Sequence, residues 1–209
     1  MTRGGRTASR AALLLLLGAG AHAGPIDDGV AFYRQRKYLE ARAVLEPLVA
    51  AEPGNARAEY FLGMTVFRAQ GPGSLEQAHR ILAKAVKLAP GNAAYLADYA
   101  GVCLLLADRD SSFGLALEGR DAMTRAIAGN PDDLEGRAGL MRFYAKAPWP
   151  LGDADKALAQ AAEIARRDPK RGLAAYQALT ALFEKAGDKQ EALSAAQAAQ
   201  KLAPAPAGR

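Results

Sequence analysis

The chain has 209 residues, of which half are apolar, and carries 27 Lys and Arg against 22 Asp and Glu, a formal charge of +5. Three of these arginines lie in the first 23 residues, and the remaining balance of 24 to 22 argues against a basic surface for nucleic acid. Cys103 is the only cysteine, which excludes a disulfide within the chain.

Residues 1–23 read as a signal peptide. Arg3, Arg6 and Arg10 precede an apolar run that starts at Ala11, and Ala21-His22-Ala23 has the small residues that signal peptidase prefers. We expect cleavage after Ala23 and a periplasmic or secreted protein with no membrane span in its mature part. An uncleaved anchor is the alternative, although the apolar run is shorter than the roughly 20 residues of a comfortable span.

The rest of the chain repeats one pattern, in which a proline follows a small residue after twelve positions. The prolines follow one another at 37, 41, 38 and 35 residues. Gly-Asn after Pro53 and Pro90, and Asp168 before Pro169, favour a helix end followed by a helix cap. The pattern predicts five helical hairpins that stack on one another. The pairs are Ala41 and Pro53, Ala78 and Pro90, Gly119 and Pro131, Ala157 and Pro169, Ala192 and Pro204.

The first half of each unit carries a second pattern, a leucine, a small residue and then an aromatic or apolar residue. It is seen at Leu62, Gly63 and Val66, and in weaker form at Leu179, Thr180 and Phe183. With the proline phase, it resembles the tetratricopeptide repeat (TPR) family over essentially the whole chain after residue 23. The resemblance implies an all-α, right-handed α-solenoid. We expect units at 24–55, 56–92, 93–133, 134–171 and 172–204, and a disordered tail at 205–209.

The resemblance also implies a function, because first helices of TPR units line a concave face that holds a partner. We expect a non-catalytic adaptor of the bacterial cell envelope that binds an extended peptide or a helix of a partner protein. Aromatic and apolar residues would form the floor of this face and basic residues its border. The residues expected to contact the partner are Tyr33, Arg34, Arg57, Tyr60, Met64, Phe67, Arg68, Arg142 and Lys146. The alternatives are a spacer without a groove, whose concave floor its own side chains fill, and an accessory enzyme with an unrecognised site.

Catalytic and metal-binding motifs are absent from the sequence after residue 23. His79 is its one histidine, so we expect no metal and no cofactor. We expect Cys103 to point into the core and His79 to face solvent, which makes a nucleophilic Cys–His pair improbable. Asp132-Asp133 is interpreted as helix-cap and loop charge.

Three segments depart from the plain repeat and are expected to lengthen the turns of the second, third and fourth hairpins: residues 70–74, 108–113 and 147–153. The third contains Trp149, the only tryptophan, which either contacts a partner or folds back over its own hairpin. A homodimer through the first unit is a further alternative.

Overall fold

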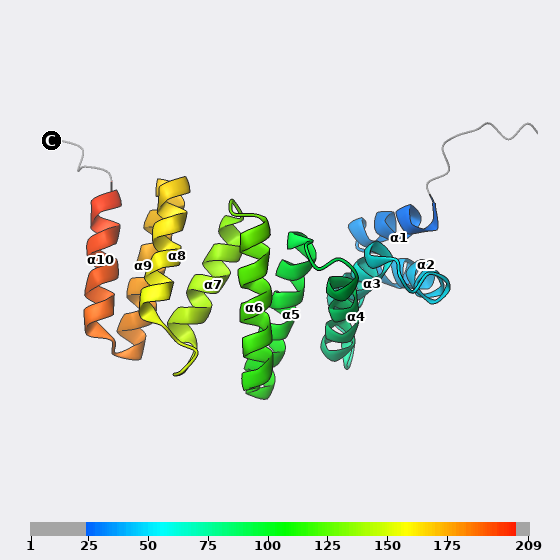
Figure 1. Ribbon diagram of the computed structural model, residues 1–209, viewed down its shortest axis with the longest axis horizontal. Helices are drawn as coiled ribbons and strands as arrows, with labels where there is room; N and C mark the ends of the chain where they lie inside the picture. The colour runs from blue at the N-terminus through cyan, green and yellow to red at the C-terminus, as the bar shows by residue number, and fades with distance from the viewer. Residues whose placement is uncertain (1–23, 204–209) are drawn as a thin grey trace, which may run out of the picture.

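The structure is a computed structural model, and it describes residues 24–203. The described part is a row of helices without strands (Figure 1). The helices are α1 (Pro25–Arg34), α2 (Tyr38–Ala51), α3 (Ala56–Ala69), α4 (Ser74–Leu88), α5 (Ala93–Asp110), α6 (Phe113–Gly129), α7 (Leu134–Lys146), α8 (Ala154–Arg167), α9 (Pro169–Ala186) and α10 (Lys189–Leu202).

Consecutive helices pair as hairpins, and the hairpins follow one another along the longest axis from α1 and α2 to α9 and α10 (Figure 1). Each hairpin therefore packs mainly against its neighbours in sequence. The prediction of an all-α solenoid is confirmed.

In four of the five hairpins, a polar side chain caps the start of the first helix. Asn55 accepts a hydrogen bond from Ala58 N at the start of α3, and Asn92 accepts one from Tyr95 N at the start of α5. Asp133 and Asp168 cap α7 and α9 in the same way. Because such caps satisfy backbone N–H groups that no helical carbonyl reaches, they fix where each hairpin begins. The capping role expected of Asn55, Asn92, Asp133 and Asp168 is confirmed.

Small residues mark the closest approach of paired helices. A Cβ on Gly29 would lie 2.7 Å from Leu45 Cγ, and one on Gly63 would lie 2.8 Å from Leu82 Cγ. Ala41 and Ala78 are completely buried on the facing helices. The repeated small residues thus bring the helix axes close enough for leucine side chains to fill the space between them.

The buried apolar residues extend from the first hairpin to the last, and they form three clusters. One lies between α1 and α4, one between α3 and α7, and one between α7 and α10. Leu140 belongs to the second cluster and its neighbour Met141 to the third. Helix α7 therefore joins the two halves of the array.

Two boundaries differ from the expectation. Helix α9 begins at Pro169 and not at residue 172, because Asp168 both ends α8 and caps α9. The expected 108–113 loop is also wrong: α5 continues to Asp110, and only Ser111 and Ser112 precede α6. Ser111 turns the chain with φ 52°, and Ser112 caps α6.

Within residues 24–203, none of the helices has the length and apolar content that a membrane span requires. The expected signal peptide and the expected tail lie outside the described residues.

Candidate functional site: an aromatic row and a polar cluster

Five aromatic rings form a row across the first three hairpins. We call Tyr38, Tyr33, Phe61, Tyr60 and Tyr95 the aromatic row. The centroid distances between successive rings are 6.1, 5.5, 5.1 and 4.1 Å. Tyr60 and Tyr95 are stacked with an angle of 14° between their planes, whereas the Tyr33–Phe61 and Phe61–Tyr60 contacts are edge-to-face. Such contacts hold each ring in one orientation.

All five rings of the aromatic row are half-buried, so each offers part of its surface to solvent. Tyr60 is fixed further by its hydroxyl, which donates a hydrogen bond of 2.5 Å to Asp98 on α5. Burial, followed by this bond to Asp98, raises the pKa of Tyr60 above the ordinary value of a tyrosine. Tyr60 therefore ties the second hairpin to the third and is neutral at physiological pH.

Met64 does not belong to a contact surface. It is 3% exposed and packs in the cluster between α3 and α7, so its prediction as a partner-binding residue is wrong. Phe67 is half-buried and packs against two core clusters, so only part of it is free for a partner. The sequence pattern places Met64 and Phe67 on the first helix of the second hairpin. How deeply each side chain is covered depends on the neighbouring hairpin.

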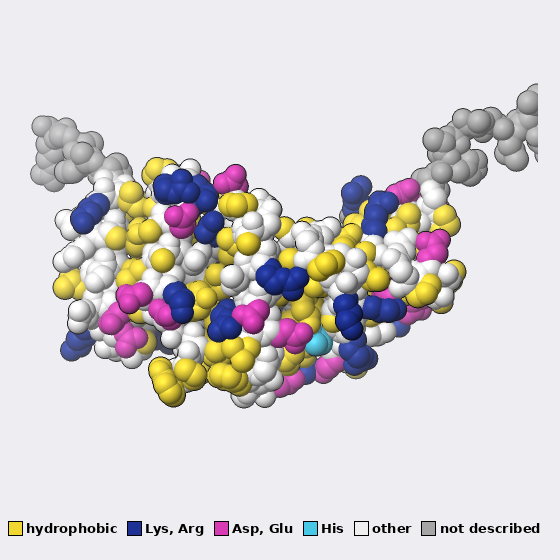
Figure 2. Space-filling model, in the orientation of Figure 1, with side chains coloured by type: hydrophobic (Ala, Val, Ile, Leu, Met, Phe, Trp, Pro, Cys, Tyr) yellow, Lys and Arg dark blue, Asp and Glu magenta, His cyan; other side chains and the backbone are white. Residues whose placement is uncertain are grey.

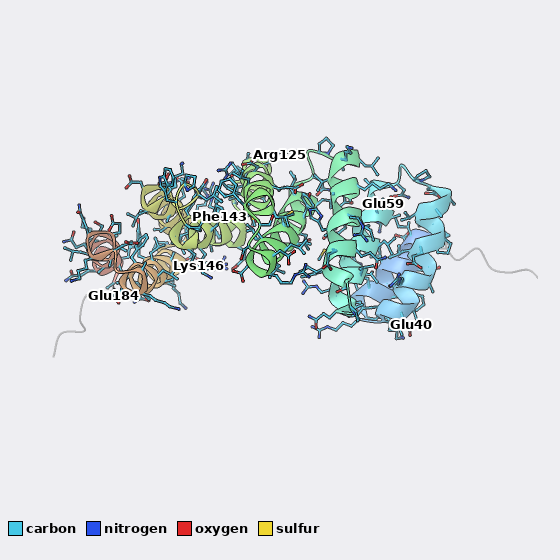
Figure 3. All side chains as sticks on the ribbon, turned by 90° about the horizontal axis from the view of Figure 1, so that it is seen from below. Glu40, Glu59, Arg125, Phe143, Lys146 and Glu184 are labelled. Carbon is cyan, nitrogen blue, oxygen red and sulfur yellow. The ribbon has the colours of Figure 1, made fainter. Side chains whose placement is uncertain are left out.

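The basic residues expected at the border are exposed, but they fall into two groups. Arg34, Arg57 and Arg68 lie on α1 and α3, whereas Arg142 and Lys146 lie on α7. Figure 3 shows Lys146 and Glu59, which mark α7 and α3, in different halves of the array. Only the first group shares helices with the aromatic row, and of this group Arg57 contacts one of its rings, that of Phe61.

Two of these arginines have contacts of their own. Arg57 donates a hydrogen bond of 2.8 Å to Asp27, and its guanidinium lies 6.0 Å from the centroid of Phe61. The guanidinium of Arg68 lies 5.3 Å from the ring of Phe67. Within residues 24–203, no ion pair involves Arg34, Arg68, Arg142 or Lys146.

Trp149 projects from the loop between α7 and α8. Its exposed fraction is 90%, so the alternative in which it folds back over its own hairpin is wrong. The loop itself is anchored to the protein, because Leu151 is 6% exposed and its backbone N–H bonds to Pro148 O at 2.9 Å. Figure 2 shows a hydrophobic projection at the lower edge, where this loop lies in Figure 1.

A polar cluster lies where the second and third hairpins meet. It consists of His79 on α4, Tyr99 and Cys103 on α5, and Glu118 on α6. The Tyr99 hydroxyl donates to Glu118 and lies 3.2 Å from His79 Nε2. Cys103 is fully buried as expected, and burial raises the pKa of its thiol to about 12. His79, however, stacks on the ring of Tyr99 and is only 21% exposed, so the expectation that it faces solvent is wrong.

A groove of about 560 Å³ opens beside this polar cluster. Tyr99 and Glu118 form part of its wall, together with residues of α4 and α6 such as Val86, Lys87 and Arg125. The sequence did not predict this groove, because it is formed between hairpins and not within one.

Known proteins resemble this chain in structure but not closely in sequence. No protein-family model and no curated protein matches it. Among solved structures, MamA protein aligns over 85% of this chain and 89% of its own, with a TM-score of 0.67 and 21% identity. YrrB, described as a TPR protein with an unusual peptide-binding site, aligns over 87% and 86%, with a TM-score of 0.68 and 18% identity.

An O-GlcNAc transferase from Thermobaculum terrenum also matches, over 68% of this chain but only 25% of its own, with a TM-score of 0.54 and 23% identity. At these identities the matches establish the fold alone. Together with the repeated small residues, prolines and helix caps, they show that the chain has the fold of the tetratricopeptide repeat family, as its sequence predicted.

Proposed function

We propose that this protein is a non-catalytic scaffold that binds an extended segment or a helix of a partner protein along the concave face of its first three hairpins. The aromatic row is the observation that carries the proposal. It offers half-buried rings that are already fixed by one another, so a partner would order few side chains on docking. Tyrosine rings of this kind supply apolar area together with hydroxyl groups for hydrogen bonds.

The charge beside the aromatic row favours an acidic partner segment. Arg34 and Arg68 are exposed and without an ion pair among the described residues, and Arg57 already holds the carboxylate of Asp27. A carboxylate of the partner would replace that of Asp27 or pair with the free guanidinium groups. The peptide-binding site named for YrrB agrees with a function of this type.

Export of the protein is part of the proposal. The arginines, apolar run and small residues of positions 1–23 support a signal peptide, and we therefore place the scaffold in the bacterial cell envelope. Cell fractionation of the full chain and determination of the N-terminus of the purified protein test this. An N-terminus at Gly24 is expected, and a cytoplasmic protein with intact residues 1–23 would contradict it.

A spacer without a peptide groove is the second candidate, and one observation favours it. Several residues of the expected floor and border are engaged within the molecule: Met64 is core, Tyr60 bonds to Asp98, and Arg57 bonds to Asp27. Leu39 on α2 is 81% exposed and gives such a spacer an apolar contact for a second copy through its first hairpin. Sedimentation of the wild type and Leu39→Glu separates the two: a dimer that the substitution dissociates supports the spacer.

Site-specific photocrosslinking tests the groove. A photoreactive residue replaces Arg34, Arg57 or Arg68 beside the aromatic row and, as matched controls, exposed Thr124 on α6 or Ser194 on α10. We expect the first three positions to capture one continuous segment of a single partner, identified by mass spectrometry, and the two controls not to capture it. Equal capture from all five positions would contradict the proposal.

A further inference from the structure

The polar cluster brings together three kinds of metal-binding atom from three helices. Nitrogen of His79, sulfur of Cys103 and a carboxylate oxygen of Glu118 all lie within 4.8 Å of one another. His79 Nε2 is 3.6 Å from Glu118 Oε2. Imidazole, thiolate and carboxylate are the ligands that zinc takes from proteins.

The positions of these side chains are set by core packing. The ring of Tyr99 stacks on His79 with a centroid distance of 5.3 Å, and Cys103 follows Tyr99 by one helical turn. Gly119, next to Glu118, lets α6 approach α5 closely: a Cβ there would lie 2.8 Å from Leu104 Cγ and 3.2 Å from Ala100 O. Glu118 is therefore held against α5 by the same small-residue contact that forms the hairpin.

The three side chains of the cluster also differ in how much of each is exposed to solvent. Cys103 is fully buried, the His79 side chain is 21% exposed and the Glu118 side chain is 46% exposed. The groove of about 560 Å³ opens at Tyr99 and Glu118. An ion from solution would thus meet the carboxylate first and the thiol last.

We propose that His79, Cys103 and Glu118 bind one zinc ion, with a water molecule as the fourth ligand. Metal–ligand bonds of about 2.0–2.3 Å place tetrahedral ligand atoms about 3.3–3.8 Å apart. His79 Nε2 and Glu118 Oε2 already lie at such a distance, and a pair as far apart as 4.8 Å would close by about 1 Å. Tyr99 no longer donates its hydrogen bond to Glu118, and its O–H bond rotates to point toward the groove. Cys103 binds as thiolate, and its proton passes to solvent.

The site goes beyond the proposed scaffold function and does not depend on it. Zinc would join α4 of the second hairpin to α5 and α6 of the third. Because the ion binds the folded array only, it would stabilise this junction by a free energy that rises with the logarithm of one plus the ratio of its concentration to its dissociation constant.

Cobalt(II) is the probe, because a thiolate bound to it gives a near-ultraviolet charge-transfer band. We expect the full chain, freed of metal by a chelator, to bind one Co²⁺ with this band and to release it to Zn²⁺. Cys103→Ala should lose the band, and His79→Gln and Glu118→Gln should each weaken binding at least about tenfold. Asp121→Asn, which changes an exposed carboxylate of the same groove, is the matched control and should bind as the wild type does.

Thermal unfolding with and without Zn²⁺ gives a second readout, and circular dichroism verifies that each variant folds. Zinc should raise the melting temperature of the wild type and of Asp121→Asn, but not that of Cys103→Ala. Absence of the charge-transfer band in the wild type would overturn the proposal. Equal Co²⁺ affinity in the wild type, His79→Gln and Glu118→Gln would also overturn it, because the thiol would then bind cobalt alone.

Discussion

Gly63 on α3 lies directly against Leu82 on α4, so that a Cβ at position 63 would be 2.8 Å from both Cγ and Cδ2 of that leucine. Leu82 is fully buried and cannot move away without disturbing its neighbours. We expect Gly63→Ala to lower the free energy of unfolding by about 1–3 kcal/mol, as overpacking of a filled core does. Urea denaturation measures it.

Gly101 on α5 is the matched control for that substitution. It is also within a helix, but a Cβ there has no neighbour within 4 Å. Alanine favours helix over glycine, so Gly101→Ala should raise the free energy of unfolding by about 0.5–1 kcal/mol. Changes of the same sign in both variants would contradict the close contact between α3 and α4.

A buried carboxylate gives a second prediction. Glu59 on α3 is 1% exposed and pairs with Lys84 on α4, which is half exposed. Lys84→Met should cost about 1–3 kcal/mol of unfolding free energy, because it leaves a charged group buried without its partner. The double variant Glu59→Met with Lys84→Met should recover most of this loss in chemical denaturation. A double variant less stable than Lys84→Met would contradict this account of the pair.

The α7–α8 loop gives a matched pair of substitutions two residues apart. Leu151 is buried and Trp149 is 90% exposed. Leu151→Ala should lower the free energy of unfolding by about 2 kcal/mol, since it leaves a cavity, whereas Trp149→Ser should change it by less than about 0.5 kcal/mol. Thermal unfolding of the two variants checks this, and a large loss in Trp149→Ser would mean that the indole packs against the protein.

Alkaline pH should destabilise the protein through two tyrosines, the half-buried Tyr60 and the buried Tyr99. Burial, with hydrogen bonds to Asp98 and Glu118, raises the pKa values of Tyr60 and Tyr99 above the unfolded value of about 10. Their contribution is present in full below pH of about 10 and is lost as pH rises further, because the unfolded chain releases the phenolic protons first.

Denaturation midpoints at about pH 9 and about pH 11 measure this effect. The midpoint of the wild type should fall between them, and that of Tyr60→Phe should fall less. An equal fall in both would show that Tyr60 does not contribute.

The hairpins and their caps could be predicted because their signals are local. Asn55 and Asn92 each act within three residues of their own position, and Gly63 contacts the partner helix of its own hairpin. A constant separation between small residue and proline therefore specified the turns and helix starts. The expected start of the fifth unit at residue 172 misses the tight α8–α9 connection, because Asp168 serves two helices at once.

The surfaces between hairpins could not be predicted in the same way. His79 follows Ala78, the small residue at the helix contact, and its own hairpin alone predicts that it faces solvent. It is covered by Tyr99 of the next hairpin. Met64 is likewise buried by contacts in the cluster that continues to α7. Both outcomes depend on how one hairpin is rotated on the next, which no short sequence pattern specifies.

The division of the core at Leu140 and Met141 has a mechanical consequence. Two side chains that follow one another on α7 serve separate clusters, so each half of the array keeps its own cohesion. Tension applied between the two ends would therefore pass through α7, because side chains of this one helix belong to both clusters.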